Sequence, residues 1–155
     1  ESFDAKETLD VLVKEKCTAL YGVPTMFVAI LEELNKSSSD LSNMRTGIMA
    51  GALCPIEVMK KVNDLMNMKE VTICYGMTET SPVSFQSFVD DPTEKRCKTV
   101  GRVHPHIEVK IVDKYNKEVT RFEDFDLYKI IARRLKTKVG EIGALCKKIV
   151  LLWLR

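Results

Sequence analysis

Three short apolar segments, each followed by a glycine-containing turn, dominate the first half of the sequence. They occupy residues 17–21, 46–50 and 71–75. Between them lie single stretches with apolar residues at helical spacing, so the predicted order is strand, helix, strand, helix, strand. Largely apolar strands joined by single helices are typical of a parallel sheet with helices on its faces. We therefore predict an α/β fold.

Amphipathic patterns mark the helices around these strands. Asp4 can cap the first helix, with Glu7 three residues later as the second member of a capping box. The second helix repeats apolar residues at positions i, i+3, i+4 and i+7. The third is expected to have Pro55 as its first residue. The residues predicted to face the core from the second and third helices are Phe27, Ile30, Leu31, Leu34, Val58, Val62, Leu65 and Met66.

The pattern changes after Pro82. Residues 83–89 alternate with period two, a loop is expected at 90–105, and residues 108–113 alternate again. We expect a smaller antiparallel or barrel-like β element beside the main sheet. From Lys114 the organisation weakens, although residues 127–135 allow an amphipathic helix. The prediction is one partial domain over residues 1–113 and an irregular or helical tail, without a recognisable domain, over residues 114–155.

Composition excludes several functions. The formal net charge is +2, so neither nucleic acid nor an anionic membrane is expected as the main partner. The longest apolar run, residues 149–154, is far shorter than the roughly 20 residues of a spanning helix. Five scattered cysteines lack metal-binding spacing and are expected to be small buried hydrophobes in a reducing compartment. His104 and His106 flank a proline, where a loop contact or solvent exposure is expected.

The loops that follow the three parallel strands should emerge at one edge of the sheet. Ligands of open α/β sheets bind at the carboxyl ends of the strands. These loops cover residues 21–25, 51–55 and 75–80. We therefore expect any ligand site at this edge.

The third of these loops contains groups suited to a nucleotide. Tyr75 offers a flat face for stacking a base, and Gly76 permits close approach of a ligand. The Thr78 hydroxyl can bond a phosphate oxygen, and the Glu79 carboxylate can hold Mg²⁺. The alternative is an ordinary strand-to-turn connection with capping side chains. Likewise, the small-residue turn at 51–55 can present backbone N–H groups to a nucleotide or can serve only as a connector.

The same loops, in this order and at this spacing, resemble those of the adenylate-forming enzymes, which include acyl-CoA synthetases, luciferases and adenylation domains of peptide synthetases. The resemblance covers Phe3 to about Asp113. Its landmarks are TALYGVPTMF, MAGALCP, YGMTETSPV and VGRVHPHIEVKIVD, of which YGMTE is the most specific. The YGMTETSPV stretch and the Pro-His after VGR look most like the medium-chain acyl-CoA synthetases of mitochondria.

The resemblance implies a two-step reaction that uses ATP, Mg²⁺ and coenzyme A. A carboxylate attacks the α-phosphate of ATP, and the thiol of coenzyme A then displaces AMP to give a thioester. Catalytic roles are implied for Thr78, at the phosphate, and for Glu79, at the metal ion. The implied binding residues are Tyr75 on adenine, Gly51, Ala52 and Leu53 around adenine and acyl-adenylate, Gly76 and Met77 beside the acyl group, and Tyr21 and Gly22 to Thr25 along the acyl channel.

Other motifs of the resembled family are not recognisable. Its Ser/Thr/Gly-rich phosphate loop, its ribose-binding Asp and its catalytic-lysine domain have no counterpart, and residues 139–142 only faintly echo a Pro-Gly-Glu-Leu segment. We therefore expect a fragment of an ATP-dependent medium-chain fatty acid ligase that is inactive by itself. The alternatives are a non-catalytic nucleotide-binding or interaction isoform, and a relative that adenylates another carboxylic acid.

No targeting segment is recognisable in the sequence, which starts at Glu1. The resemblance implies the mitochondrial matrix, and otherwise an intracellular location is expected.

Overall fold

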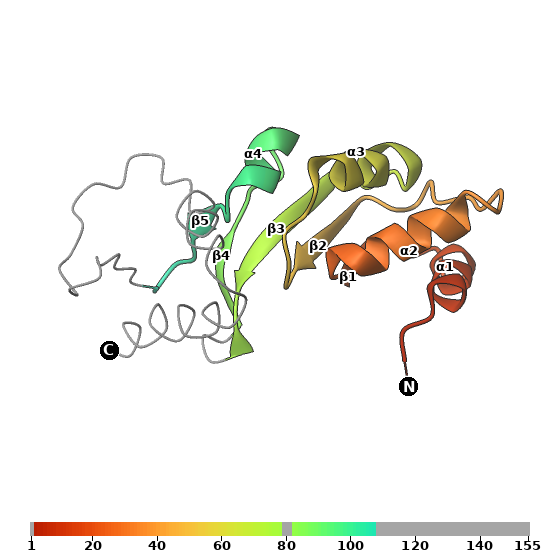
Figure 1. Ribbon diagram of the computed structural model, residues 1–155, viewed down its shortest axis with the longest axis horizontal. Coiled ribbons are helices and arrows are strands. Elements are labelled where there is room, and N and C mark those ends of the chain that lie inside the picture. The colour runs from red at the N-terminus through yellow and green to blue at the C-terminus, as the bar shows by residue number, and fades with distance from the viewer. Residues whose placement is uncertain (1, 79–81, 108–155) are drawn as a thin grey trace, which may run out of the picture.

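Helices and strands alternate along the chain. The computed structural model describes residues 2–78 and 82–107, and Figure 1 shows the order of their elements. The predicted strand at 108–113 and the predicted tail at 114–155 lie outside these residues. The helices are α1 (Ala5–Lys14), α2 (Pro24–Leu34), α3 (Ile56–Leu65) and α4 (Thr93–Lys98). The strands are β1 (Ala19–Gly22), β2 (Thr46–Ala50), β3 (Glu70–Gly76), β4 (Val83–Gln86) and β5 (Arg102–Val103).

The strands form one mixed sheet in the order β1-β2-β3-β4-β5. Strands β1, β2 and β3 are parallel, which confirms the predicted parallel arrangement. Strands β4 and β5 are antiparallel to their neighbours, as predicted for the region after Pro82. The antiparallel element is a continuation of the main sheet, however, because β4 pairs directly with β3.

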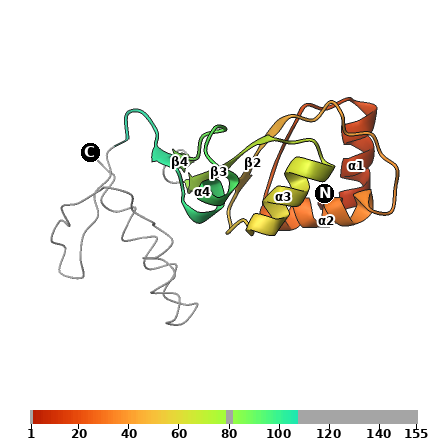
Figure 2. The ribbon, with the colours of Figure 1, turned by 90° about the horizontal axis from the view of Figure 1, so that it is seen from above.

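The helices form a single layer. The chain moves one place in the same direction from β1 to β2 and from β2 to β3, so right-handed crossovers put α2 and α3 on the same face of the sheet. Helix α1 contacts α2, α2 contacts α3, and α3 contacts α4. Figure 2 shows α2 and α3 side by side next to the strands.

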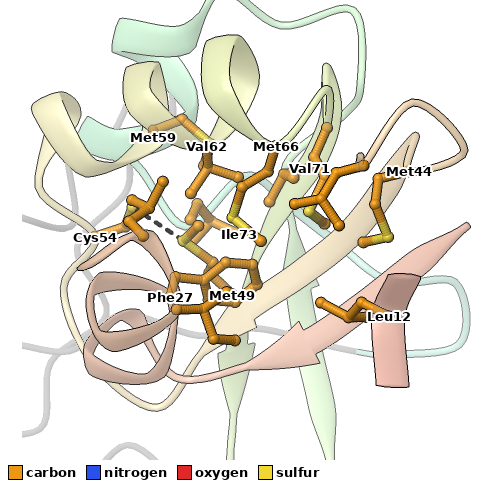
Figure 3. Packing of buried hydrophobic residues seen from close by; sticks show 14 of the residues in the cluster. Leu12, Phe27, Met44, Met49, Cys54, Met59, Val62, Met66, Val71 and Ile73 are labelled. Atoms are coloured by element: carbon orange, nitrogen blue, oxygen red, sulfur yellow. Dashed lines mark hydrogen bonds between the residues drawn. The ribbon is translucent and has the colours of Figure 1, made fainter. Parts of the chain in front are cut away.

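The core lies between this helical layer and the sheet. Strand β2 contributes Met49, and β3 contributes Val71 and Ile73 (Figure 3). Phe27 of α2 and Val62 of α3 are fully buried against them. Burying a side chain of this size contributes about 1.5–3 kcal/mol. Methionine fills irregular gaps well, and the fully buried methionines are Met44, Met49, Met59, Met66 and Met68.

Several local predictions are confirmed and others are wrong by a few residues. The Asp4 carboxylate accepts a hydrogen bond from the Glu7 N–H at 2.8 Å and caps α1. Strand β1 begins at Ala19, not at residue 17, because the Cys17 N–H donates to the Leu12 carbonyl and closes the end of α1. Pro55 has an extended backbone and precedes α3, which begins at Ile56.

Two further features differ from the prediction. Leu65 is exposed, whereas Met59 is buried. The packed face of α3 therefore consists of Met59, Val62 and Met66, at positions i, i+3 and i+7. Helix α4 lies within the segment predicted to be a loop. It has only six residues, too few for a helical repeat to be visible in the sequence.

Candidate functional site

Three loops begin at one edge of the sheet. Gly22 pairs with Met49, and Met49 pairs with Ile73, so the three parallel strands end at nearly the same level. We call residues 21–25, 51–55 and 75–78 the loop edge. The predicted convergence of the three loops is therefore confirmed for the described residues.

The loops after β1 and β2 touch each other at Gly51. Gly51 has φ +80°, a conformation that favours glycine. A β-carbon at this position would lie 3.2 Å from Cγ1 of Val23. Tyr21, in β1, is 63% exposed, and Leu53, in the loop after β2, is 53% exposed. Exposed apolar side chains at the ends of neighbouring strands suit an apolar ligand group.

The end of β3 is shaped by Tyr75 and Gly76. Tyr75 is half-buried, and its ring meets the ring of Phe85 edge-on, with centroids 5.9 Å apart and an interplanar angle of 63°. The β3–β4 pairing becomes irregular between Tyr75 and Gly76. A β-carbon at Gly76 would collide with the carbonyl oxygen of Pro82. The returning chain therefore passes directly beside the end of β3, where only glycine leaves room.

Beyond Gly76 the structure locates two more of the predicted residues. Met77 is half-buried and Thr78 is exposed, so the Thr78 hydroxyl is accessible at the loop edge. Glu79 and Thr80 lie outside the described residues, and the metal-binding role of Glu79 stays a prediction. Within residues 2–78 and 82–107, no group of three His, Cys, Asp or Glu side chains could hold a metal ion.

A buried arginine, which the sequence did not indicate, fastens α4 to β3. Arg96 is 5% exposed and donates hydrogen bonds to the carbonyl oxygens of Lys69, at 3.3 Å, and Val71. Its Nη2 lies 3.4 Å from Oγ1 of Thr93. Arginine is seldom buried without a partner, and here its partners are mainly backbone carbonyls. A basic residue in a strongly charged segment gives no sequence signal of this burial.

A chain of polar side chains joins β3, β4 and the loop after β5. Nε2 of Gln86 donates to Oγ1 of Thr72 at 2.8 Å, and Oε1 of Gln86 lies 3.1 Å from Nε2 of His104. Of the two outcomes expected for the histidines, a loop contact or solvent exposure, His104 therefore shows the first. Ser87 adds a further link, because its Oγ accepts from the Ile73 N–H at 2.8 Å. These bonds hold β4 in place beside the strand that carries Tyr75.

Asp91 organises the turn between β4 and α4. Its Oδ2 accepts from the Phe88 N–H at 3.0 Å, and its Oδ1 lies 3.0 Å from Nζ of Lys95. Burial, the largest single influence, opposes ionisation, but the Phe88 hydrogen bond and the Lys95 ammonium together outweigh it. The pKa of the Asp91 carboxyl is therefore lowered from its ordinary value.

Parallel strands, helices on one face and a loop edge that contains glycines are typical of α/β domains that bind a ligand at the carboxyl ends of their strands. Comparison with protein families gives the class: the sequence matches the AMP-binding enzyme family over residues 1–142. The chain belongs to this family of AMP-binding enzymes.

Individual relatives agree with this assignment. YngI of Bacillus subtilis is 52% identical over 113 residues, which cover 73% of this chain and 21% of YngI. The mitochondrial medium-chain acyl-CoA ligase ACSF2 of Rattus norvegicus is 44% identical over 120 residues, which cover 77% of this chain and 20% of ACSF2. The chain thus spans about a fifth of the length of these relatives.

A solved structure supports the fold. The amide bond synthetase McbA from Marinactinospora thermotolerans superposes with a TM-score of 0.65 at 25% identity. The match covers 79% of this chain and 25% of McbA. The expected fold, part of the large N-terminal domain of an adenylate-forming enzyme, is therefore confirmed for the described residues. Within residues 2–78 and 82–107, no helix is long and apolar enough to cross a membrane.

Proposed function

We propose that this chain forms the acyl-adenylate-binding part of an ATP-dependent acyl-CoA ligase for medium-chain fatty acids. The observation that carries the proposal is the convergence of three loops at the ends of β1, β2 and β3. An acyl-adenylate has an aromatic base, a charged phosphate and an apolar tail. The loop edge supplies an aromatic ring, an exposed hydroxyl and exposed apolar side chains in the same place.

The proposed roles follow the chemistry of each group. Tyr75 stacks on adenine, and the backbone of Gly51, Ala52 and Leu53 borders the base. The exposed Thr78 hydroxyl donates to a phosphate oxygen. Gly76 and Met77 border the acyl group.

The acyl tail and the metal ion involve two further parts of the chain. Tyr21 and Gly22 to Thr25 wall the acyl channel, where the exposed Tyr21 ring offers apolar surface. Glu79 is the proposed ligand of Mg²⁺, which would neutralise phosphate charge when bound.

The reaction proceeds in two steps in this proposal. The substrate carboxylate attacks the α-phosphorus of ATP, the bond to the β-phosphate oxygen breaks, and pyrophosphate leaves. The sulfur of coenzyme A then attacks the acyl carbon, and AMP leaves. Because the acid and the phosphate are held at one edge, the loops contribute by positioning the reacting groups.

The medium-chain preference and the mitochondrial matrix are both part of the proposal. The named ACSF2 ligases of rat and zebrafish, each 44% identical, support them. Because the chain spans about a fifth of these relatives, we propose that its 155 residues bind the ligand without completing turnover. Production of octanoyl-CoA from octanoate, ATP, Mg²⁺ and coenzyme A by this chain alone would contradict that point.

Titration calorimetry with octanoyl-sulfamoyladenosine, a stable acyl-adenylate analogue, tests the function. We expect binding to the 155-residue chain, and at least about tenfold weaker binding for Thr78→Ala, since a hydrogen bond to the anionic sulfamate that replaces the phosphate contributes about 1.5–3 kcal/mol. Ser38→Ala is the matched control, because Ser38 is an exposed hydroxyl residue in the segment between α2 and β2, at the opposite edge of the sheet. Absence of binding, or equal loss in both variants, would refute the proposed site.

The acid specificity is tested with a second analogue. If the ligand is a medium-chain acid, benzoyl-sulfamoyladenosine should bind about tenfold or more weakly than the octanoyl compound, because it buries less apolar surface. Tighter binding of the benzoyl analogue would support the alternative of another carboxylic acid.

A further inference from the structure

Tyr75 and Phe85 lie directly opposite each other on the neighbouring antiparallel strands β3 and β4. Side chains at directly opposite positions of such a pair project to the same face of the sheet and interact. The two rings meet edge-on, with their centroids 5.9 Å apart. This separation lies within the range of about 4.5–7 Å that is usual for attractive aromatic pairs. The orientation of the Tyr75 ring is therefore set partly by Phe85.

The surroundings of Tyr75 differ between the two sides of β3. Phe85 lies on the side of β4. On the side of β2, Ala50 pairs with Cys74, and the residues that follow this pair in the two strands are Gly51 and Tyr75. Gly51 carries no side chain, so a flat base can approach the Tyr75 ring from this side. The hydroxyl oxygen of Tyr75 is buried although the residue as a whole is half-buried, so the exposed surface of Tyr75 lies elsewhere on the residue.

Hydrogen bonds of the residues next to Phe85 fix its place in β4 independently of the ring contact. The Ser87 N–H donates to the Ile73 carbonyl oxygen at 2.9 Å, and Ser87 Oγ accepts from the Ile73 N–H at 2.8 Å. Nε2 of Gln86 donates to Oγ1 of Thr72 at 2.8 Å. These bonds hold β4 in register with β3 and involve no atom of the Phe85 ring. A substitution of Phe85 therefore removes the ring contact without removing the bonds that hold its strand.

The aromatic pair is separate from the hydrophobic core. Among the described residues, the core cluster between the helical layer and the sheet includes neither Tyr75 nor Phe85. Both residues are half-buried at the end of the sheet where the loop edge begins. Packing of the core therefore does not account for this contact. A role at the loop edge accounts for it, because Tyr75 is the residue proposed to stack on adenine.

We propose that Phe85 is a positioning residue for adenine, because its ring holds the Tyr75 ring in the orientation in which the base stacks. This inference rests on the proposed function, in which Tyr75 contacts the base and Phe85 does not touch the ligand. A ring that is already held in its bound orientation loses less conformational freedom when the ligand binds. Phe85 therefore contributes to the affinity for the base and not to the affinity for the acyl group.

Two ligands that differ only in the base test the proposal. Octanoyl-sulfamoyladenosine carries adenine, and an abasic analogue carries the same octanoyl-sulfamoyl group on 1-deoxyribose. The ratio of their dissociation constants, measured by titration calorimetry on the 155-residue chain, isolates the contribution of the base. Wild type should bind the adenosine compound at least about fivefold more tightly, because bases stack favourably on aromatic rings. Phe85→Leu should reduce this ratio about threefold, because the edge-on contact is lost, and should leave binding of the abasic compound within about twofold of wild type.

Matched variants separate positioning from general destabilisation. Phe85→Tyr keeps the aromatic contact and should keep the wild-type ratio. Phe88→Leu makes the same change at an exposed ring that contacts Arg102, and it should change neither affinity. Tyr75→Leu should remove most of the contribution of the base, and adding Phe85→Leu to it should reduce the ratio no further. Circular dichroism checks folding, and Phe85→Met takes the place of Phe85→Leu if the latter does not fold.

Failure of this inference is distinguishable from failure of the proposed function. An equal loss of affinity for both ligands in Phe85→Leu, or an unchanged ratio, would overturn the positioning role of Phe85 while the proposed function stands. A further threefold loss when Phe85→Leu is added to Tyr75→Leu would do the same. If wild type bound both ligands equally, or bound neither, the proposed recognition of adenine by Tyr75 would be refuted, and the role of Phe85 with it.

Discussion

Gly51 and Val23 lie so close that a β-carbon on the glycine would be 3.2 Å from Cγ1 of the valine. The contact joins the loop after β1 to the loop after β2. Since β1 and β2 are neighbours in the sheet, the two loops form one continuous surface at the loop edge. Substitutions at this contact should therefore change the shape of the ligand site as well as its stability.

Gly51→Ala should lower the free energy of unfolding by about 1 kcal/mol, because alanine rarely adopts a positive φ. Binding of octanoyl-sulfamoyladenosine should weaken in parallel. Adding Val23→Ala removes the steric contact but leaves the backbone strain, so the double variant should recover only part of the loss. Urea unfolding of the two single variants and the double variant separates the contributions. If Gly51→Ala kept wild-type stability and binding, the role of the Gly51–Val23 contact in shaping the loop edge would be contradicted.

Gly47→Ala should be much more disruptive. A β-carbon at Gly47 would collide with the carbonyl oxygen of Leu20 and would lie 2.7 Å from Cε of Met68. The first obstacle is backbone of the neighbouring strand, so β1 and β2 must move apart, at a cost of about 3 kcal/mol. Gly22→Ala is the control, because its nearest obstacle is the flexible Met26 side chain at 3.3 Å. Equal unfolding midpoints for both variants in urea would refute this explanation.

Arg96→Met should destabilise the chain by about 2 kcal/mol or more, because it leaves the carbonyls of Lys69 and Val71 without these donors. Arg96→Lys should have an intermediate effect, since one ammonium cannot reproduce the geometry of the guanidinium. Arg102→Met is the control variant. Arg102 lies 4.4 Å from the centre of the exposed Phe88 ring, a contact of about 0.5–1 kcal/mol. Guanidinium unfolding should show the larger loss for Arg96→Met, and the reverse order would contradict its structural role.

Asp91→Asn tests the pH dependence of stability. The pKa of Asp91 is lower in the folded chain than the ordinary value of about 3.9, so its ionised form favours the folded state above that pH. The contribution is lost as the pH falls through the folded-state pKa. Asp91→Asn should therefore be less stable than wild type by up to about 1 kcal/mol at pH 7, with the difference shrinking towards pH 3. Thermal unfolding at both pH values is the measurement, and a difference that grows on acidification would contradict the prediction.

The positions of the main strands could be predicted because their signals are local. Apolar runs that end in glycine mark β2 and β3 within one or two residues, and parallel pairing then follows from the intervening helices. The approximate convergence of Gly22, Gly51 and Gly76 at one edge of the sheet could be predicted from the parallel pairing alone. The binding experiments with acyl-adenylate analogues test the roles proposed for these residues and for Thr78 and Glu79.

Features that depend on contacts between distant segments were not predictable. Arg96 is buried because it reaches the start of β3, which no local pattern in its own segment indicates. The choice between Met59 and Leu65 on α3 depends on where α2 and α4 pack. A helical repeat indicates that a helix has an apolar face, but it does not determine the angle at which neighbouring elements cover that face.

The reversal of direction between β3 and β4 has a consequence for enzyme engineering. Gly76 and Pro82 lie beside each other, so the intervening peptide starts and finishes at almost the same point. The free-energy cost of closing a flexible loop between two fixed ends increases only slowly with the length of the loop. Exchanging the peptide between Gly76 and Val83 would thus replace Thr78 and Glu79 together without moving either strand, which makes this connection the position at which the proposed phosphate and metal residues can be redesigned as a unit.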